Sequence, residues 1–203
     1  MEAFEQFVAI AMEAEGFVVS PAVKFDVARR TRKAAYEEIQ KHGYEVDLVG
    51  ANANRLVLAT VKSFFGSSGV GSDGVMGVSK NDRQNRMYAL LNNVDVRKGV
   101  VEGACQRFGY TEDQVSVRLY VGKFAAAKSG AHEKRIKAWC AQQVLGGGPI
   151  EVIALGDVIA QVRNAAKSKQ YRDNPVLVTM KVLEHAGLLT VALPDDVGSG
   201  IDA

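Results

Sequence analysis

Two short apolar segments joined by a four-residue turn constrain the fold of this chain more than any other feature. Residues 44–50 read YEVDLVG, residues 55–65 read RLVLATVKSFF, and ANAN lies between them. Both segments are rich in Val and Leu, and Asn-containing turns commonly join antiparallel strands. The sequence therefore predicts a β-hairpin with Glu45 and Asp47 on its first strand and Thr60 and Lys62 on its second.

The segments around this hairpin alternate between helical and extended patterns, which is typical of α/β proteins. Glycines follow several of the helical patterns, as they do at helix C-termini. The loop rich in Gly and Ser after the hairpin is either a plain connection or a lid over a substrate. In chain order we expect a helix over 2–15, a strand over 17–28, a helix over 31–42, the hairpin, the loop over 66–79, two helices between 82 and 108, a strand over 116–125, a helix over 131–145, a strand over 149–155, and helices over 157–167 and from 175 to about 187.

The length of 203 residues is sufficient for one domain with a substantial core. We expect an α/β core over residues 1–155, built on a central mixed β-sheet flanked by helices, and a C-terminal helical extension over 156–203 that covers the sheet. The pattern of the extension, a helix followed by Gly187 and an apolar stretch, also occurs in winged-helix modules, which is the alternative.

Composition narrows the function classes. Twenty-five Lys and Arg against 23 Asp and Glu leave a net charge of +2, so any surface that binds a polyanion must be local. Cys105 and Cys140 have no zinc-ligand spacing, which favours idle thiols in a reducing compartment. The first 16 residues carry acidic side chains and no basic leader, and no apolar run is long enough to cross a membrane. We expect a soluble, cytoplasmic protein without a membrane partner.

The charged residues of the hairpin are its informative part. Side chains alternate along a strand, so Glu45 and Asp47 are expected on one face of the first strand, and Thr60 and Lys62 on one face of the second. Charges on a largely apolar hairpin must be paired or bound to an ion. One explanation is a structural salt bridge between Asp47 and Lys62. The other is phosphodiester hydrolysis, in which carboxylates hold a hard cation and an ammonium offsets developing charge.

The stretch GYEVDLVGANANRLVLATVKSFFGSSGV resembles the PD-(D/E)xK nuclease superfamily, and is most similar to its Mrr-type and RecB-like members. The resemblance covers the order helix, strand, strand with Asp, strand with x-Lys, helix, strand. It implies a restriction-endonuclease-like core, DNA as the partner, and Mg²⁺ or Mn²⁺ as the cofactor. In matching positions, Asp47 and the carbonyl of Val61 bind the metal, Lys62 is the catalytic ammonium, and Thr60 stands where the second acidic residue belongs.

Further positions match the same resemblance. Glu5 lies on the first helix, where many members carry an accessory Glu. Gln84 and Tyr88 reproduce a Q-x-x-x-Y pattern found after the Lys strand in RecB-like members, which gives Gln84 a place in the catalytic site. The residues expected to contact DNA are Arg29, Arg30, Arg32, Lys33, Ser63 and Tyr88, although the basic cluster among them also fits a solvated helix start.

Thr60 departs from the family pattern, because a hydroxyl is a poorer ligand for a divalent cation than a carboxylate. Glu45 or Glu5 could supply the missing carboxylate, and Glu45 is therefore a second metal-ligand candidate. Three hypotheses remain open. The chain is a metal-dependent DNA endonuclease of restriction, repair or defence, working most simply as a twofold dimer. Otherwise it is a nuclease-like DNA-binding or assembly module without cleavage, or an α/β protein with a structural Asp–Lys pair.

Overall fold

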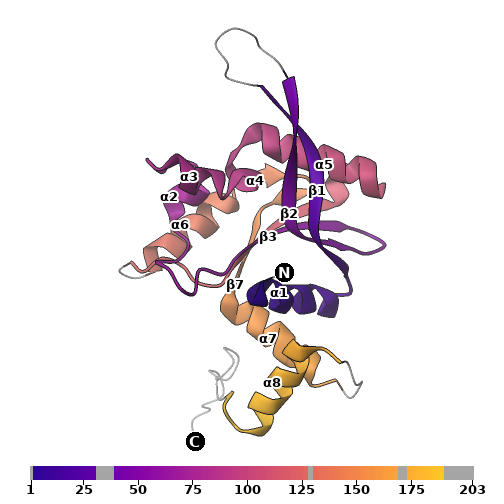
Figure 1. Cartoon of the computed structure of the whole chain (residues 1–203), viewed down its shortest axis with the longest axis vertical. Coiled ribbons are helices and arrows are strands. Elements are labelled where there is room, and N and C mark those ends of the chain that lie inside the picture. Colours follow the sequence, from indigo (N-terminus) through magenta and orange to yellow (C-terminus); the bar gives the residue numbers. More distant parts are fainter. Residues whose placement is uncertain (1, 31–38, 128–129, 169–172, 190–203) are drawn as a thin grey trace, which may run out of the picture.

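The protein is an α/β structure with a central five-stranded sheet and helices on both of its faces (Figure 1). The computed structural model describes residues 2–30, 39–127, 130–168 and 173–189. The strands are β1 (Val18–Arg30), β2 (Ile39–Ala51), β3 (Leu56–Lys62), β4 (Val115–Val121), β5 (Val144–Leu145), β6 (Gly148–Pro149) and β7 (Glu151–Ala154). The helices are α1 (Ala3–Ala14), α2 (Ser72–Val75), α3 (Asp82–Arg86), α4 (Ala89–Asn92), α5 (Val94–Phe108), the 3₁₀ helix Glu112–Gln114, α6 (Ala131–Cys140), α7 (Leu155–Ala166) and α8 (Pro175–His185).

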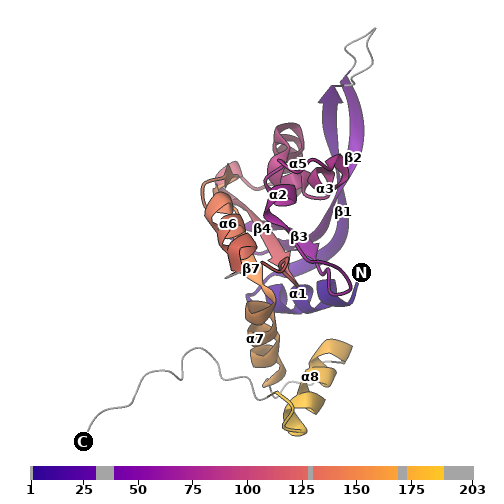
Figure 2. The same cartoon turned by 90° about the vertical axis from the view of Figure 1, so that its left-hand side faces the viewer.

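The sheet is mixed, in the order β1-β2-β3-β4-β7. β1, β2 and β3 are antiparallel neighbours, whereas β3, β4 and β7 run parallel to one another. The pairing of β1 with β2 extends from Val18↔Ala51 to Arg30↔Ile39 and passes well beyond the rest of the sheet. These two strands therefore project from the molecule as a ribbon, which is clearest in the side view (Figures 1 and 2).

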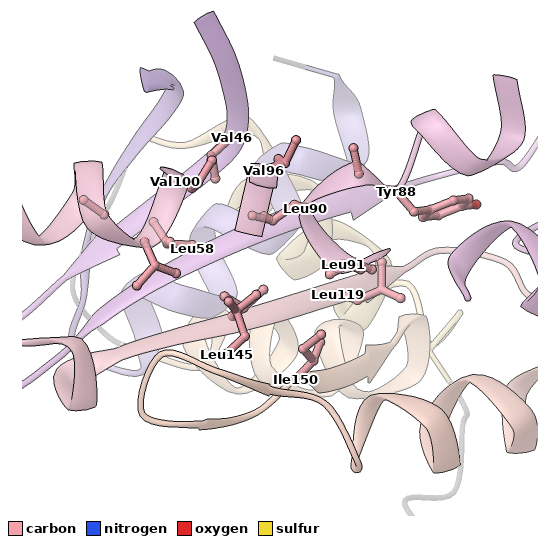
Figure 3. Close-up of a cluster of buried hydrophobic side chains, with 14 of the residues drawn as sticks. Val46, Leu58, Tyr88, Leu90, Leu91, Val96, Val100, Leu119, Leu145 and Ile150 are labelled. Carbon is pink, nitrogen blue, oxygen red and sulfur yellow. The ribbon is translucent and has the colours of Figure 1, made fainter. Parts of the chain in front are cut away.

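Two hydrophobic clusters lie on opposite sides of the sheet. The α5-side cluster joins the sheet to α2, α4, α5 and α6, and Figure 3 shows part of it. The α1-side cluster joins the sheet to α1, α7 and α8. Members of the first include Val46, Leu56, Leu58, Leu90, Val100, Leu119 and Ile136, and members of the second include Phe4, Val8, Leu48, Val57, Ala59, Val61, Val158 and Leu177.

Glycines in α5 allow this helix to lie close against β1. A Cβ at Gly99 would come within 3.0 Å of Val27 Cγ1, and one at Gly103 within 3.3 Å of the Phe25 ring. Such distances are tighter than ordinary van der Waals contact, so a larger residue at either position would push the helix from the strand. The two glycines thus permit the close packing of α5 on β1.

The expected α/β fold with a central mixed sheet flanked by helices is confirmed, as is the antiparallel hairpin of β2 and β3. Four local expectations need correction. The two helices expected between 82 and 108 are three, α3, α4 and α5. Residues 39–42, expected at the end of a helix, begin β2; residues 31–38 of that helix lie outside the described residues. α6 ends at Cys140, and Val144–Leu145 pairs with Gly148–Pro149 instead of continuing the helix. The loop over 66–79 contains the short helix α2.

The C-terminal helices pack on the core through the α1-side cluster, in which Val158, Val162 and Leu177 lie with residues of α1. The side chain of Asn174 caps α8 by accepting from the amides of Val176 and Leu177, as expected for a Pro-initiated helix. The apolar stretch needed for a winged-helix element falls largely outside the described residues, so that alternative stays a prediction. Within the described ranges, none of the helices combines the length and apolar character that a membrane crossing requires.

Candidate active site at the split between two strands

The candidate site lies where β2 and β3 separate. Their backbone pairing covers Ala51↔Leu56 to Leu48↔Ala59 and stops there. Beyond this point β2 continues with β1 as the ribbon, whereas β3 continues beside β4 to Lys62. The residues after Ala59 consequently lose β2 as a partner, and any amide that faced it needs another acceptor.

Asp47 supplies that acceptor. Its Oδ2 atom accepts the amide N–H of Val61 at 2.6 Å, the hydroxyl of Thr60 at 3.1 Å and the ammonium of Lys62 at 3.2 Å. Hydrogen bonds to an ionised acceptor are stronger than neutral ones. The carboxylate therefore accepts the backbone hydrogen bond of Val61 where β2 and β3 separate, and it also holds Lys62 in place. The predicted contact among Asp47, Thr60 and Lys62 is thus present in the structure.

This group lies on the α5 side of the sheet and stays open to solvent. Leu56 and Leu58 belong to the α5-side cluster, and Thr60 and Lys62 occupy the next alternate positions of the strand. The side chain of Lys62 is 18% exposed and that of Asp47 is 24% exposed, while Thr60 is buried. The site is therefore sheltered but accessible at the end of the strand.

The strand alternation is interrupted at Asp47. Val46 belongs to the α5-side cluster and Leu48 to the α1-side cluster, although alternate residues of a regular strand share a face. On β1, Ala22 stands opposite this point and has a φ of 54°, which is uncommon for a residue other than glycine. The expectation that Glu45 and Asp47 share one face rested on regular alternation, which does not hold here.

Neither predicted source of a second carboxylate bonds to the Asp47 group. Glu45 lies 3.6 Å from Lys24 on the exposed ribbon. Glu5 lies on α1, which packs on the α1 side of the sheet, and its carboxylate accepts the amide of Glu2 in a capping box. Ser63, predicted to contact DNA, donates to the Glu2 carboxylate at 3.3 Å.

The arrangement limits which cation the site can hold. Among the described residues there is no cluster of three or more His, Cys, Asp or Glu side chains suited to a metal ion. Asp47 Oδ1 accepts no hydrogen bond from those residues, so one carboxylate oxygen remains for a cation. Mg²⁺ is often held by one or two carboxylates together with substrate phosphates and water. Among the described residues of this group, Asp47 is the carboxylate that could take part in such a site.

Val61 takes part through its amide, whereas the sequence-based expectation used its carbonyl as a metal ligand. The backbone of Arg29 and Arg30 lies at the outer end of β1, paired with Gln40 and Ile39. Arg32 and Lys33 lie outside the described residues. The ribbon thus carries the described half of the basic cluster away from the Asp47 group.

Gln84 and Tyr88 lie on the α5 side as well. Gln84 belongs to α3, is exposed, and accepts a hydrogen bond from the Ser79 hydroxyl at 2.8 Å. Tyr88 precedes α4 and is 4% exposed. Burial raises the pKa of the Tyr88 phenol well above its ordinary value, which keeps it protonated.

Sequence reasoning missed two polar groups. Ser72 is fully buried, and both its amide and its hydroxyl lie within 3.2 Å of His132 Nδ1. Arg118 is also buried and donates to the carboxylates of Glu15 and Glu151, each at 2.9 Å. A lone Arg inside the apolar run SVRLYV was the available signal for the second group. No sequence pattern pointed to the first, because Ser72 and His132 are 60 residues apart.

The comparisons with known proteins assign neither a family nor a function to the chain. No protein-family model and no curated protein matches the chain. A solved structure described as "Crystal Structure of Protein of Unknown Function AF1548" is similar over 91% of this chain and 77% of that chain, with 13% sequence identity and a TM-score of 0.43.

Proposed function

We propose that the chain is a metal-dependent phosphodiesterase that cleaves DNA, built on a restriction-endonuclease-like core of the PD-(D/E)xK type. The observation that carries the proposal is the contact of Asp47 with Lys62 at the open end of β3, on one side of the sheet. The element order α1, β1, β2, β3, then the helices α2 to α5, then β4 also supports it, because it is similar to the helix, strand, strand, strand, helix, strand pattern of the resemblance.

The chemistry follows from the position of the two groups. In hydrolysis, the oxygen of a water molecule bonds to phosphorus, the bond to one ester oxygen breaks, and a proton lost by the water is balanced by one gained at the leaving oxygen. The Lys62 ammonium lies where it would offset the charge that builds on the phosphoryl oxygens. Asp47 holds that ammonium and, with its second oxygen, would bind the cation, which supplies polarisation of the phosphate when bound.

A second candidate function is DNA binding without cleavage. The observation that favours it is Thr60, whose hydroxyl donates to Asp47 in the slot where the family carries an acidic residue. With one carboxylate at the split, cation affinity depends on the phosphate of bound DNA. Both candidates share DNA as partner, and a twofold dimer would suit cleavage of both strands.

A cleavage assay separates these possibilities. Supercoiled plasmid and a labelled duplex are incubated with the wild type and with Asp47→Asn, Lys62→Gln and Thr60→Glu, each with Mg²⁺ or Mn²⁺. Lys98→Gln serves as the matched control, since it removes an equal charge from an exposed ion pair with Glu102 on α5. We expect wild-type nicking, a loss of at least 100-fold in the first two variants, and unchanged activity in the control.

The outcomes are distinct. Cleavage that survives in both Asp47→Asn and Lys62→Gln would exclude this group from the reaction. Wild-type inactivity combined with salt-sensitive DNA binding and with cleavage gained by Thr60→Glu would establish the binding module instead. Inactivity of every variant without DNA affinity would leave Asp47 and Lys62 as a structural pair.

A further inference from the structure

A cavity lies near the Asp47 group, on the same side of the sheet. It has a volume of about 360 Å³ and is bounded by the loop after β3, by α2 and α3, and by the start of α6. One wall is Phe64, two residues after Lys62, so at most ~7 Å of extended chain separates the two. The parallel strands β3 and β4 both end here, which is the edge where α/β sheets commonly bind ligands.

The cavity combines apolar walls with polar groups. Phe64, Met87 and Tyr88 provide aromatic and thioether surface. Gln84 and His132 provide an amide and an imidazole, while Asp73 is already paired with Arg135 at 3.2 Å. The lining contains no Lys and no Arg among the described residues. Such a cavity suits a flat, uncharged, polar group better than a phosphate.

The Tyr88 side chain forms part of the cavity wall. Tyr88 is 4% exposed, and it also belongs to the α5-side cluster, so its ring is held in place beside the cavity. In Figure 3 the Tyr88 hydroxyl points away from the other labelled side chains of the α5-side cluster. A ring carbon of Tyr88 would lie 3.2 Å from a Cβ at Gly74, so the glycine leaves space for the ring.

Phe64 gives further support. Its φ is 47°, a conformation that costs free energy for a bulky side chain and that is enriched at functional sites. This conformation directs the chain from the end of β3 into the glycine-rich loop that forms one side of the cavity.

We infer that this cavity binds the base of one unpaired nucleotide of the DNA substrate, while the adjacent phosphate lies at Lys62. The inference rests on the proposed function for the identity of the ligand as a nucleobase. Bases displaced from a duplex bind in pockets that stack their faces and hydrogen-bond their edges, which are the two kinds of surface present here. Tyr88 and Gln84 provide the edge contacts, and Phe64 and Met87 the flat walls.

The test uses the four deoxynucleosides, which carry no phosphate and need no metal. Each is titrated into ¹⁵N-labelled protein, and chemical-shift changes are expected at Gly69, Gly71 and Gly74. Tyr88→Phe removes one hydroxyl and should weaken the tightest-binding nucleoside by about 3- to 10-fold. Gln84→Ala should weaken it similarly, and because Gln84 is exposed this variant keeps the fold.

Tyr110→Phe is the matched control, since it removes a hydroxyl that donates to the Asn52 carbonyl at 2.6 Å. It should bind nucleosides as the wild type does. Absence of shifts with all four nucleosides, or equal affinity of wild type, Tyr88→Phe and Gln84→Ala, overturns the inference. Plasmid cleavage without nucleoside binding would exclude the base-binding role of the cavity and leave the proposed nuclease function standing. Nucleoside binding without cleavage in any metal would support the base-binding role and exclude the nuclease function.

Discussion

Removal of the Asp47 carboxylate should destabilise the fold as well as the site. In Asp47→Ala, the amide of Val61 and the buried hydroxyl of Thr60 lose their acceptor, and Lys62 loses its counter-ion. A buried polar group left without a partner costs about 1–3 kcal/mol. The ammonium of Lys62 retains some contact with water, so the loss of its counter-ion adds little to the destabilisation. We expect Asp47→Ala to lower the free energy of unfolding by about 2–4 kcal/mol.

Asp47→Asn separates the two roles of this residue. The amide oxygen of Asn has nearly the same position as the carboxylate oxygen and can still accept from Val61 and Thr60. Only the charge interaction with Lys62 is lost, and an ion pair that stays in contact with water contributes about 1 kcal/mol or less. Asp47→Asn should therefore stay within about 1 kcal/mol of the wild type in stability while losing any cleavage.

Urea denaturation followed by circular dichroism measures both variants. For a chain of this size, the Asp47→Ala effect corresponds to a decrease in Tm of about 4–16 °C. Asp82→Ala is the control, because Asp82 is exposed on α3 and its replacement should change stability by less than about 0.5 kcal/mol. Equal stability of Asp47→Ala and Asp47→Asn would refute the reasoning. It would mean that the side chain at position 47 does not stabilise the fold by accepting hydrogen bonds from Val61 and Thr60.

Three further predictions follow from the same structure. Thr60→Glu should lower Tm in the presence of a chelator, because it places a second carboxylate beside Asp47. Millimolar Mn²⁺ should then raise the Tm of Thr60→Glu more than the Tm of Thr60→Gln, and equal increases in the two variants would contradict this prediction. Arg118→Met should lower the free energy of unfolding by about 2–4 kcal/mol in urea, because two carboxylates lose a buried partner; an unchanged midpoint would contradict the structural role. Burial raises the pKa of the Cys140 thiol from 9.0 to about 12, so the native state keeps this proton longer than the unfolded state. Stability is then complete below pH 9 and decreases toward pH 12 by up to about 1.4 kcal/mol per pH unit, and Cys140→Ala should show a shallower decrease in alkaline denaturation.

Much of the architecture could be predicted because local sequence and tertiary structure agree there. The turn ANAN forms as expected, with Asn52 Oδ1 accepting from the amides of Asn54 and Arg55. The apolar runs of β3 and β4 are buried on both faces, as the central strands of an α/β sheet usually are. The first helix forms as expected and buries Phe4, Val8 and Ala11 at helical spacing, although Ala9, Ile10 and Met12 are buried as well.

The start of β2 was mispredicted because tertiary structure overrides local pattern there. The sequence IQKH has no strong strand preference, and its neighbours in the chain fit a helix. In the protein, Ile39, Gln40 and Lys41 pair with the end of β1, 9 to 13 residues back along the chain. Strand pairing of this kind depends on the partner strand, which a single segment does not reveal.

The site could be predicted only as a set of residues. The spacing of Asp47 and Lys62 indicated their contact, but not that a split in the sheet creates it. Regular alternation predicted that Glu45 would join Asp47, and the interruption opposite Ala22 removes the basis for that expectation. The cavity around Tyr88 was hidden for a similar reason, since its lining comes from segments as far apart as Phe64 and His132.

The split between β2 and β3 links the stability of the fold to the chemistry of the site. A strand that leaves its neighbour exposes amides, and a carboxylate is a strong acceptor for such an amide. The same carboxylate also contacts Lys62, the residue of β3 that follows Val61. An aspartate at this position thus stabilises the fold in addition to any part in catalysis. Under the proposed function, we expect Thr60 to decide between cleavage and binding, because an acidic group there would add a cation ligand and would also repel Asp47.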